Sequence, residues 1–467
     1  MHHSFIALAL LIPGALVAAP APARPNLIIL LADDLGWGDA GFQGATDVKT
    51  PNLDRLAESG VRFTQGYVTA PQCIPSRAGL ITGRYQQHVG IECNPDDSKN
   101  NVYQLPEGVP TLASQLLHAG YRTGMVGKWH LGEPDSTQPF NKGFEWCAYM
   151  RRGMGVHFRD SSWLKDEDGE PINWFRDARD QTIPIGGRGY FTETFTDKAL
   201  EFIEQKDDRP FFLYLSYHPP HWPLDAPAES IAAYRDLADV NRQVCCALIS
   251  DLDAQIGRLL DHLRSSGQEK NTVVVFLSDN GAPEYSGPQT IPVKVGQNAS
   301  TNGILSGCKG MLLEGGIRVP FVMAWPGTLP AGKTVDWPVI SLDLTPTFLA
   351  LAGAPPLPDA DGVNLMPDLD PEISATGPER ALFWRFDTQW SRQNAVRRGT
   401  WKLVDYGAPG NRKLFDLAAD PSEKSDRAAA EPARATALAR ELDAWLALLP
   451  PPNPEWVTVK KIPAPGE

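Results

Sequence analysis

Short, continuously apolar runs alternate along the chain with segments whose apolar residues recur at helical spacing. Residues 26–32 (NLIILLA), 211–217 (FFLYLSY) and 272–277 (TVVVFL) are typical of strands buried on both faces of a sheet. Residues 111–119 and 239–264 have helical patterns that end in glycine-containing turns. Further patterns indicate a strand at residues 123–126, strand or crossover segments at residues 321–325 and 339–344, and a short helix at residues 347–352. The alternation predicts an α/β fold, in which helices sandwich a large, mostly parallel sheet.

The pattern changes at a segment rich in proline and aspartate, residues 354–371. Beyond it, short strand patterns and one helical pattern follow, at residues 381–386, 395–397, 401–404 and 432–448. We therefore predict a main domain over residues 25–370 and a smaller C-terminal α+β domain over residues 371–467, which ends in a proline-rich tail.

The N-terminus contains one apolar run, residues 5–17 (FIALALLIPGALV), followed by small residues. This pattern predicts a secretory signal peptide over residues 1–24 that is cleaved between residues 19 and 24, with an ordinary N-terminal strand as the alternative. The run is too short to cross a bilayer, and no later run approaches the roughly 20 apolar residues of a membrane helix. We expect an exported protein, periplasmic or extracellular, without a transmembrane segment.

The composition narrows the class of protein. Of 467 residues, 42% are hydrophobic and 21% charged, which is typical of a globular chain. The formal net charge of −13 disfavours a nucleic-acid partner, which requires a basic face. Six cysteines without a Cys-x-x-Cys pair exclude a disulfide scaffold and disfavour a structural zinc site.

Four of the predicted strands are each followed by residues suited to metal binding or acid–base chemistry. In chain order these are Asp33 and Asp34, Lys128 and His130, His218 and His221, and Asp279 and Asn280. Because ligands of open parallel sheets bind beyond the carboxyl ends of the strands, we expect these residues to converge. The carboxylate and amide oxygens favour Ca²⁺ or Mg²⁺ over zinc. Taken singly, Asp-Asp and Asp-Asn-Gly are also common turn sequences.

A cysteine stands at a second candidate centre, in the sequence Cys73-Ile-Pro-Ser-Arg77. Pro75 suits the first turn of a helix, which would place Cys73 at the helix N-terminus, where an anion is favoured. An activated nucleophile beside Arg77 suits attack on an anionic ester. The alternative is a buried or disulfide-bonded cysteine at a helix cap.

The segment CIPSRAGLITGR resembles the C-x-P-S-R…L-x-T-G-[RK] pattern of the formylglycine-dependent type I sulfatases of the alkaline phosphatase superfamily. Other blocks are similar to that family in the same order, including NLIILLADDLGWGD, GYRTGMVGKWHLG, VVVFLSDNG and KGMLLEGGIRVPF. The similarity runs from about Pro25 to about Asp426. It implies an alkaline-phosphatase-like fold and a sulfuric ester hydrolase.

The resemblance also implies a set of site residues. Cys73 would be oxidised to formylglycine by a maturation enzyme, and Ca²⁺, with Mg²⁺ as the alternative, would be bound by Asp33, Asp34, residue 73, Asp279 and Asn280. Arg77, Lys128 and Lys309 would neutralise the sulfate. One hydroxyl of the hydrated aldehyde would attack sulfur, His221 or Lys309 would protonate the leaving oxygen, and His130 would deprotonate the second hydroxyl to expel sulfate.

Several of these residues also have ordinary structural interpretations. His130 suits a buried core histidine, Lys309 a solvated lysine, and His218 a residue that only orients its neighbours or contacts substrate. Glu314-Gly315-Gly316 suits a backbone turn, and Cys245 and Cys246 suit small core positions. With Cys73 converted, five cysteines remain, and the sequence assigns no disulfide.

Three irregular polar segments are candidates for substrate loops, residues 92–102, 134–181 and 282–307. The middle segment contains basic and aromatic residues that suit a sulfated sugar, namely Arg151, Arg152, His157, Trp163 and Trp174. A solvated loop with a few buried tryptophans is the alternative. We therefore predict that the protein hydrolyses an organic sulfate ester, and that the substrate is a sulfated glycan. The competing functions are phosphonate or phosphate ester hydrolysis and sulfated-glycan binding without turnover.

Overall fold

The structure is a computed structural model that describes residues 24–452 with several gaps. The gaps are residues 95–103, 133, 151–155, 159–174, 180, 186, 188, 284–298, 370–376, 389–390 and 409. The predicted signal peptide therefore lies outside the described residues, apart from residue 24, and so does the boundary that we expect near residue 370.

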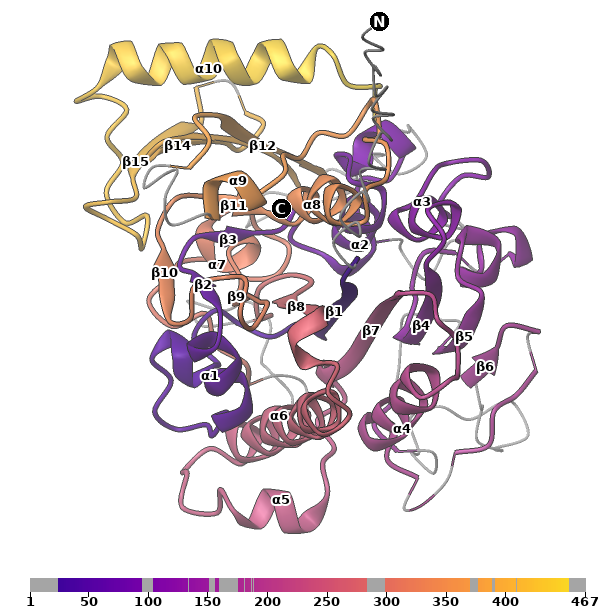
Figure 1. Ribbon diagram of the computed structural model, residues 1–467. Helices are drawn as coiled ribbons and strands as arrows, with labels where there is room; N and C mark the ends of the chain where they lie inside the picture. Colours follow the sequence, from indigo (N-terminus) through magenta and orange to yellow (C-terminus); the bar gives the residue numbers. More distant parts are fainter. Residues whose placement is uncertain are drawn as a thin grey trace, which may run out of the picture.

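A nine-stranded sheet forms the centre of the molecule (Figure 1). From edge to edge its strands are β10 (Lys333–Val335), β2 (Val61–Phe63), β9 (Phe321–Ala324), β8 (Thr272–Ser278), β1 (Asn26–Asp33), β7 (Phe211–Pro220), β4 (Arg122–Lys128), β5 (Trp146–Met150) and β6 (Phe175–Asp177). Only β9 and β6 run antiparallel to their neighbours. Strands β3 (Gly66–Tyr67) and β11 (Val339–Ile340) form a separate parallel pair. The mostly parallel sheet predicted from the apolar runs is confirmed.

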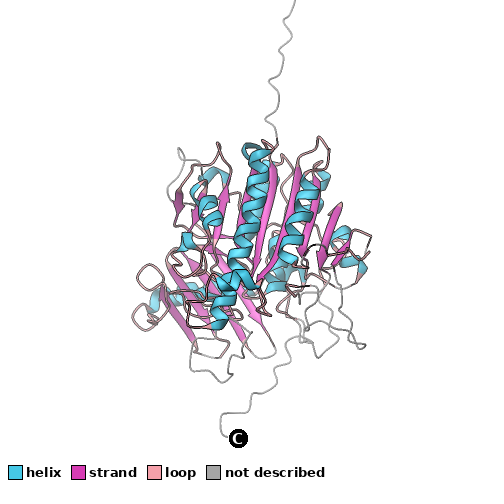
Figure 2. Ribbon diagram, turned by 90° about the horizontal axis from the view of Figure 1, so that it is seen from below, coloured by secondary structure: helices cyan, strands magenta, loops and turns pink. Residues whose placement is uncertain are grey.

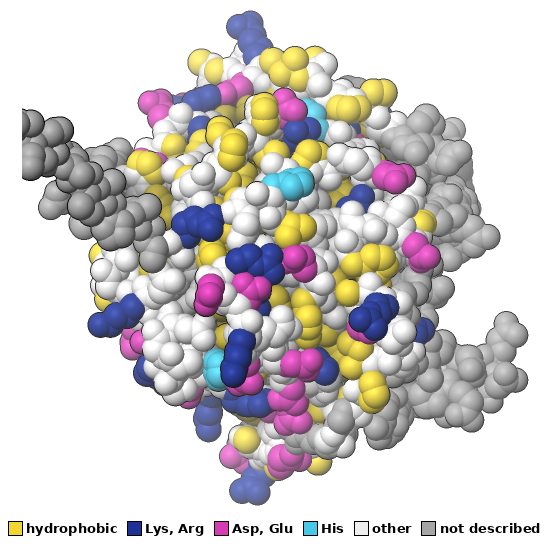
Figure 3. All heavy atoms as spheres, turned by 45° about the vertical axis from the view of Figure 1, so that its right-hand side comes forward, with side chains coloured by type: hydrophobic (Ala, Val, Ile, Leu, Met, Phe, Trp, Pro, Cys, Tyr) yellow, Lys and Arg dark blue, Asp and Glu magenta, His cyan; other side chains and the backbone are white. Residues whose placement is uncertain are grey.

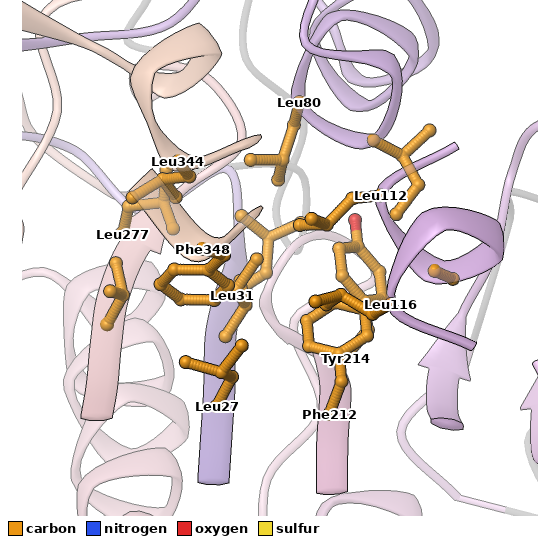
Figure 4. Close-up of a cluster of buried hydrophobic side chains, with 14 of the residues drawn as sticks. Leu27, Leu31, Leu80, Leu112, Leu116, Phe212, Tyr214, Leu277, Leu344 and Phe348 are labelled. Carbon is orange, nitrogen blue, oxygen red and sulfur yellow. The ribbon is translucent and has the colours of Figure 1, made fainter. Parts of the chain in front are cut away.

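Helices cover both faces of this sheet, and Figure 2 shows those that cover one face. They are α1 (Pro51–Glu58), α2 (Cys73–Thr82), α3 (Leu112–His118), α4 (Phe191–Ile203), α5 (Ala228–Ala232), α6 (Val240–Ser265), α7 (Glu314–Ile317), α8 (Leu344–Leu351) and α9 (Met366–Leu369). Side chains of a strand alternate between faces, so β1 contributes to two cores. Leu27 and Leu31 pack with residues of α2, α3 and α8 (Figure 4), whereas Ile28 and Leu30 pack with residues of α1, α4 and α6.

The C-terminal part is a four-stranded antiparallel sheet with one helix. Its strands are β12 (Ala381–Asp387), β13 (Arg392–Arg398), β14 (Trp401–Asp405) and β15 (Arg412–Asp416), and α10 (Pro432–Leu446) packs on one face of the sheet. The other face meets the central part through Trp384 and Phe386, which share a core with Tyr67. The predicted small α+β unit is confirmed, although β15 was not predicted.

Charged residues are also buried where the two sheets meet. We call this group the junction cluster: Tyr67, Glu314, Arg318, Arg397, Lys402 and Glu423. Glu314 begins the one-turn helix α7 and is fully buried there. The expected backbone turn at Glu314-Gly315-Gly316 is therefore a short helix that contributes a buried charge.

Two expectations about irregular regions need correction. Residues 134–181 were expected to lack regular structure, but they contribute β5 and β6 to the edge of the central sheet. Residues 339–344 were expected as strand or crossover, but only Val339–Ile340 is strand and a 3₁₀ turn follows it. Strands β5 and β6 are too short to give an alternating pattern that could be recognised in the sequence. The buried pair Cys245 and Cys246 lies in α6, in a helix as expected.

Candidate active site

The carboxyl ends of four strands lie side by side at one edge of the central sheet. Strands β8, β1, β7 and β4 are consecutive neighbours and run parallel. Asp33 ends β1, and Asp279 directly follows β8, which is in register with β1. Lys128 ends β4, and His218 lies near the end of β7. The structure therefore brings together residues that are up to 246 positions apart in sequence.

Two residues at this edge have a left-handed backbone, which is uncommon outside glycine. Asp34 has φ 64° and His130 has φ 60°. The Asp34 N–H donates to Asp279 Oδ1 over 3.1 Å, which ties the turn after β1 to the end of β8. Such conformations are costly and persist where the surrounding structure demands them, often at functional sites.

Cys73 is the first residue of α2 and is only 1% exposed. The adjacent helix N-terminus is supported by Asn94, whose Oδ1 accepts the Ile74 N–H over 3.0 Å. The Cys73 Sγ lies 3.6 Å from Asp33 Oδ1 and 3.3 Å from Lys309 Nζ. The predicted helix start at Cys73 is correct, and it places this side chain against the strand-end carboxylates.

Four of these side chains offer closely spaced ligand atoms. One atom each of Asp33, Asp34, Cys73 and Asp279 lies within 4.8 Å of the others. Asn280 donates through Nδ2 to Asp34 Oδ1 over 2.7 Å, while its Oδ1 is buried and has no hydrogen-bond partner among the described residues. An unpaired buried oxygen is costly, and a hard cation would satisfy it. The donor set therefore fits Ca²⁺ or Mg²⁺.

Three cations surround the carboxylates. Lys128 Nζ lies 2.7 Å from Asp33 Oδ2, and Arg77 Nη2 lies 2.7 Å from Asp279 Oδ2. Lys309 Nζ lies 2.7 and 2.9 Å from the two oxygens of Asp34. We call these residues, together with Asp33, Asp34, Cys73, Asp279 and Asn280, the site cluster. It presents oxygen ligands to a cation and positive groups to an anion in one buried place.

The site cluster shifts the protonation of its own members. Burial alone would raise the pKa of Asp33, but the charge of Lys128 holds it well below its usual range. Burial likewise opposes a charged Lys309, yet Asp34 raises its pKa well above the usual value. Burial raises the pKa of the Cys73 thiol to about 12. Without modification, residue 73 is thus a protonated thiol and a poor nucleophile at neutral pH.

Two histidines follow the β7 strand end. His218 Nδ1 donates to Asp33 Oδ2 over 3.2 Å. His221 Nδ1 donates to the Trp222 carbonyl over 2.6 Å, which leaves Nε2 facing Asp34 Oδ2 at 3.7 Å. Burial lowers the pKa of His221 well below its usual value. Its imidazole is therefore neutral, with an open nitrogen that points into the site.

His130 lies two residues beyond Lys128, the last residue of β4. Its Nδ1 is buried and has no hydrogen-bond partner in the part of the chain that the structure describes. Burial first, and then the charges of Lys128 and Arg77, lower the pKa of His130 well below its usual value. A neutral imidazole of this kind is competent to accept a proton.

The residues expected to bind substrate are placed differently from one another. His157 is fully buried, donates through Nε2 to the His221 carbonyl over 2.8 Å, and packs its ring 4.8 Å from that of His218. This position favours support of the two histidines. Arg151 and Arg152, with Trp163 and Trp174, lie outside the described residues.

The sequence analysis did not identify two serines, Ser216 and Ser300, that hydrogen-bond to residues of the site. Ser216 of β7 accepts a hydrogen bond of 2.6 Å from Arg77 Nη1, and its only sequence signal is a hydroxyl in an otherwise apolar strand. Ser300 donates to the Asp34 carbonyl over 3.1 Å and contacts Asp39, which is paired with Arg242. No local pattern marks Ser300, because its role depends on a distant segment.

Comparisons with known proteins agree with this geometry. The family model described as Sulfatase matches residues 25–354, and the model described as N-sulphoglucosamine sulphohydrolase, C-terminal, matches residues 308–447. Mouse N-acetylgalactosamine-6-sulfatase is 34% identical over 372 residues, which cover 76% of this chain and 68% of that protein. Human arylsulfatase A is 34% identical over 439 residues, covering 87% and 80%.

A solved structure extends the similarity to the three-dimensional level. The crystal structure of Ps i-CgsB in complex with k-i-k-neocarrahexaose has a TM-score of 0.83 and 31% sequence identity, and the match covers 92% of this chain and 94% of that one. The C-terminal sheet described above is therefore part of the shared architecture.

Proposed function

Because this chain belongs to the sulfatase family, we propose that it removes sulfate from a sulfated glycan, with residue 73 as the nucleophile. The hydrolysis of sulfuric esters itself follows from the family and its named relatives. One observation carries the assignment of the centre: the buried Cys73 side chain lies between the carboxylates of the strand ends and the Lys309 ammonium.

A divalent cation fits this centre. Asp33, Asp34, Asp279 and Asn280, with an oxygen of modified residue 73, would hold Ca²⁺, and the unpaired Asn280 Oδ1 supports this choice. When bound, the cation supplies Lewis-acid polarisation of a sulfate oxygen. Mg²⁺ is the alternative, since it takes the same kind of ligand.

Residue 73 acts after conversion to formylglycine in this proposal. The hydrated aldehyde supplies two hydroxyls on one carbon, so that one can attack sulfur and the other can later expel sulfate. The raised pKa of the Cys73 thiol agrees with a need for this conversion. Arg77, Lys128 and Lys309 hold the sulfate oxygens and offset the negative charge that grows in the transition state.

The proton transfers fall to side chains whose free positions suit them. His221 has an open Nε2 that takes up a proton when the anionic ester binds and passes it to the leaving oxygen. Lys309, which stays protonated, is the second candidate for this step. His130, neutral and with an unpaired Nδ1, accepts the proton of the second hydroxyl.

The glycan part of the proposal rests on the named relatives. The mouse relative is an N-acetylgalactosamine-6-sulfatase, and the solved neighbour was crystallised with a neocarrahexaose. His218, Arg151, Arg152 and His157 remain our candidates for substrate contact, with His157 placed to act through His221. We keep the division into a catalytic domain over residues 25–370 and a C-terminal unit over residues 371–467 as part of the proposal.

The compartment is proposed on the N-terminal pattern. Among the helices that the structure describes, none combines the length and apolar character of a membrane span. We propose export to the periplasm or the extracellular space, guided by residues 1–24, and a maturation enzyme as the partner that modifies Cys73.

The test is direct. Protein from its native host is digested with trypsin, and the mass of the peptide of residues 63–77 is measured by mass spectrometry. We expect the mass of a peptide with an aldehyde in place of the Cys73 thiol. The same protein should release sulfate from sulfated oligosaccharides and from 4-nitrophenyl sulfate. Faster cleavage of a phosphonate monoester, or binding of sulfated glycan without sulfate release by modified protein, would contradict the proposal.

A further inference from the structure

Lys309 differs from the other members of the site cluster in how the fold holds it. Asp33, Lys128 and Asp279 lie at strand ends, and Cys73 and Arg77 lie in α2. Lys309 lies in an irregular segment, residues 306–313, that precedes the short helix α7. A regular element therefore does not fix its backbone, although its Nζ contacts both oxygens of Asp34 and the Cys73 sulfur.

The central part of the molecule holds only the beginning of this segment. The Lys309 N–H donates to the Ala282 carbonyl over 3.0 Å, and the Gly310 N–H donates to the Pro71 carbonyl over 2.8 Å. The next residues turn away, at Gly310 with φ 88°, and Met311 is 43% exposed.

The C-terminal sheet holds the rest, through Gln393 of β13. Its Nε2 donates to the Gly310 carbonyl over 3.1 Å, and its Oε1 accepts the Leu312 N–H over 3.0 Å. One side-chain amide thus pairs with residues two apart, as the backbone of a neighbouring β-strand does. Gln393 is 6% exposed, and Ser391 Oγ accepts a second hydrogen bond from Nε2 over 3.1 Å, which fixes the amide's orientation.

A second contact from the same unit holds the end of the segment. The Glu423 carboxylate accepts the Glu314 N–H over 2.6 Å, although Glu423 has a left-handed backbone with φ 51°. The C-terminal unit therefore holds the segment on both sides of Met311, through β13, and at the start of α7, through Glu423. Of these contacts, the one from Gln393 is nearest to Lys309 along the chain.

We propose that Gln393 is a positioning residue, which fixes the Lys309 ammonium against Asp34 and residue 73 by clamping the Gly310 and Leu312 backbone. The inference rests on the proposed function of Lys309 in binding sulfate. A lysine on a long flexible side chain gains accurate placement only when its backbone is fixed, and displacement of a catalytic group by 1 Å costs up to about a hundred-fold in rate. The C-terminal sheet would thus be a working part of the active site.

The test compares Gln393→Ala with a matched control on the same strand, Asn394→Ala. Successive side chains of a strand point to opposite faces, so Asn394 does not face the Lys309 segment. We expect Gln393→Ala to lower kcat/KM for 4-nitrophenyl sulfate by about 10- to 100-fold, while Asn394→Ala stays within about two-fold. Thermal unfolding and the aldehyde content of residue 73 are measured for every variant.

A double-mutant cycle separates positioning from general support. In a Lys309→Ala background, Gln393→Ala should change kcat/KM by less than about two-fold, because nothing remains to be positioned. An equal loss in both backgrounds, or no loss in the wild-type background, would overturn the inference. If Lys309→Ala itself keeps full activity, the proposed function of Lys309 fails instead, and the two failures are distinguished.

Gln393→Glu provides a further readout that keeps the overall shape. Its carboxylate still accepts the Leu312 N–H, but when ionised it faces the Gly310 carbonyl without a hydrogen. Protonation restores a donor, so the activity of this variant, relative to wild type, should recover as the pH falls. A constant ratio at all pH values would contradict the clamp.

Discussion

The molecule contains two clusters of buried charge, and they are built on different principles. In the junction cluster, two acids share one cation: Lys402 Nζ lies 2.9 Å from each of Glu314 and Glu423. Tyr67 donates to Glu314 over 2.5 Å, and the Glu314 N–H donates to Glu423. Within the part of the chain that the structure describes, the buried Asn280 Oδ1 of the site cluster and the His130 Nδ1 beside it have no hydrogen-bond partner.

The difference concerns what each cluster is built to hold. In the junction cluster the charges of Glu314 and Glu423 are offset by Lys402 from the C-terminal sheet, so the cluster joins the central and C-terminal sheets. An unpaired buried oxygen costs stability in the site cluster, which is the expected mark of a place that completes its contacts with a ligand. A left-handed backbone does not separate the two clusters, because Asp34 and Glu423 both have one. Buried charge alone therefore does not identify the active site; what distinguishes the site cluster is an unpaired oxygen, Asn280 Oδ1, beside carboxylates that could share a cation.

Removal of the nucleophile should give the largest effect and should separate the clusters most clearly. Cys73→Ala is expected to lower kcat for 4-nitrophenyl sulfate by at least about ten-thousand-fold, because residue 73 carries the reacting atoms. The small change in a helix start should cost about 1 kcal/mol or less in the free energy of unfolding. Steady-state kinetics and urea unfolding check both numbers, and residual activity near wild type would exclude residue 73 as the nucleophile.

Lys402→Met should show the reverse pattern. Two buried carboxylates lose their shared cation, so the free energy of unfolding should fall by about 3–5 kcal/mol. At a temperature where the variant is folded, kcat per folded molecule should fall by less than about ten-fold, since Lys402 does not reach the site. Urea unfolding measures the first quantity. As a control, Glu314→Gln combined with Lys402→Met should recover part of the lost stability. A loss of kcat in Lys402→Met without a loss of stability would contradict the structural role of the junction cluster.

Asn280→Ala tests whether the unpaired oxygen serves a cation. Dialysis against EDTA should lower the activity and melting temperature of the wild type, and Ca²⁺ should restore both. The variant should need about 10- to 100-fold more Ca²⁺ for the same restoration, because one ligand is missing. Calorimetric titration with Ca²⁺ measures the affinity, and an identical affinity in the variant would argue against Asn280 as a ligand.

An exposed ion pair should give the smallest effect and serves as the baseline. Arg258 and Asp197 lie 2.8 Å apart, but their side chains are 45% and 62% exposed. Arg258→Ala should change the free energy of unfolding by less than about 1 kcal/mol and leave kcat/KM unchanged. A loss of more than about 1 kcal/mol in the free energy of unfolding would show that this exposed ion pair contributes more to stability than is expected of surface charges. On the face shown in Figure 3, acidic and basic side chains are mixed in this exposed manner.

Much of the central sheet could be predicted because its strands are buried on both faces. The runs that form β1, β7 and β8 are almost continuously apolar, because both faces of these strands are covered and every side chain is buried. The edge strand β6 and its neighbour β5 are short and were not predicted, since pairing of β5 with β4, and of β6 with β5, decides their structure more than their own sequences do.

By itself, the sequence determined the chemistry of the strand ends. Asp33, Asp279 and Lys128 follow apolar runs, and any parallel sheet built from those runs must bring their carboxyl ends to one edge. Cys73 before Pro75 likewise determined a helix start, because proline suits only the first turn.

Only the tertiary structure decided which polar groups are satisfied and which remain open. Glu314 and Asp34 are both buried acids followed by short turns, yet Glu314 is paired with Lys402 where the two sheets meet, whereas Asp34 is paired with Lys309 among the candidate cation ligands. The same holds for Gln393, whose amide meets the Lys309 segment 83 residues away. Hydrogen bonds and ion pairs act over a few ångströms in space, so partners far apart in sequence leave no local pattern from which to predict them.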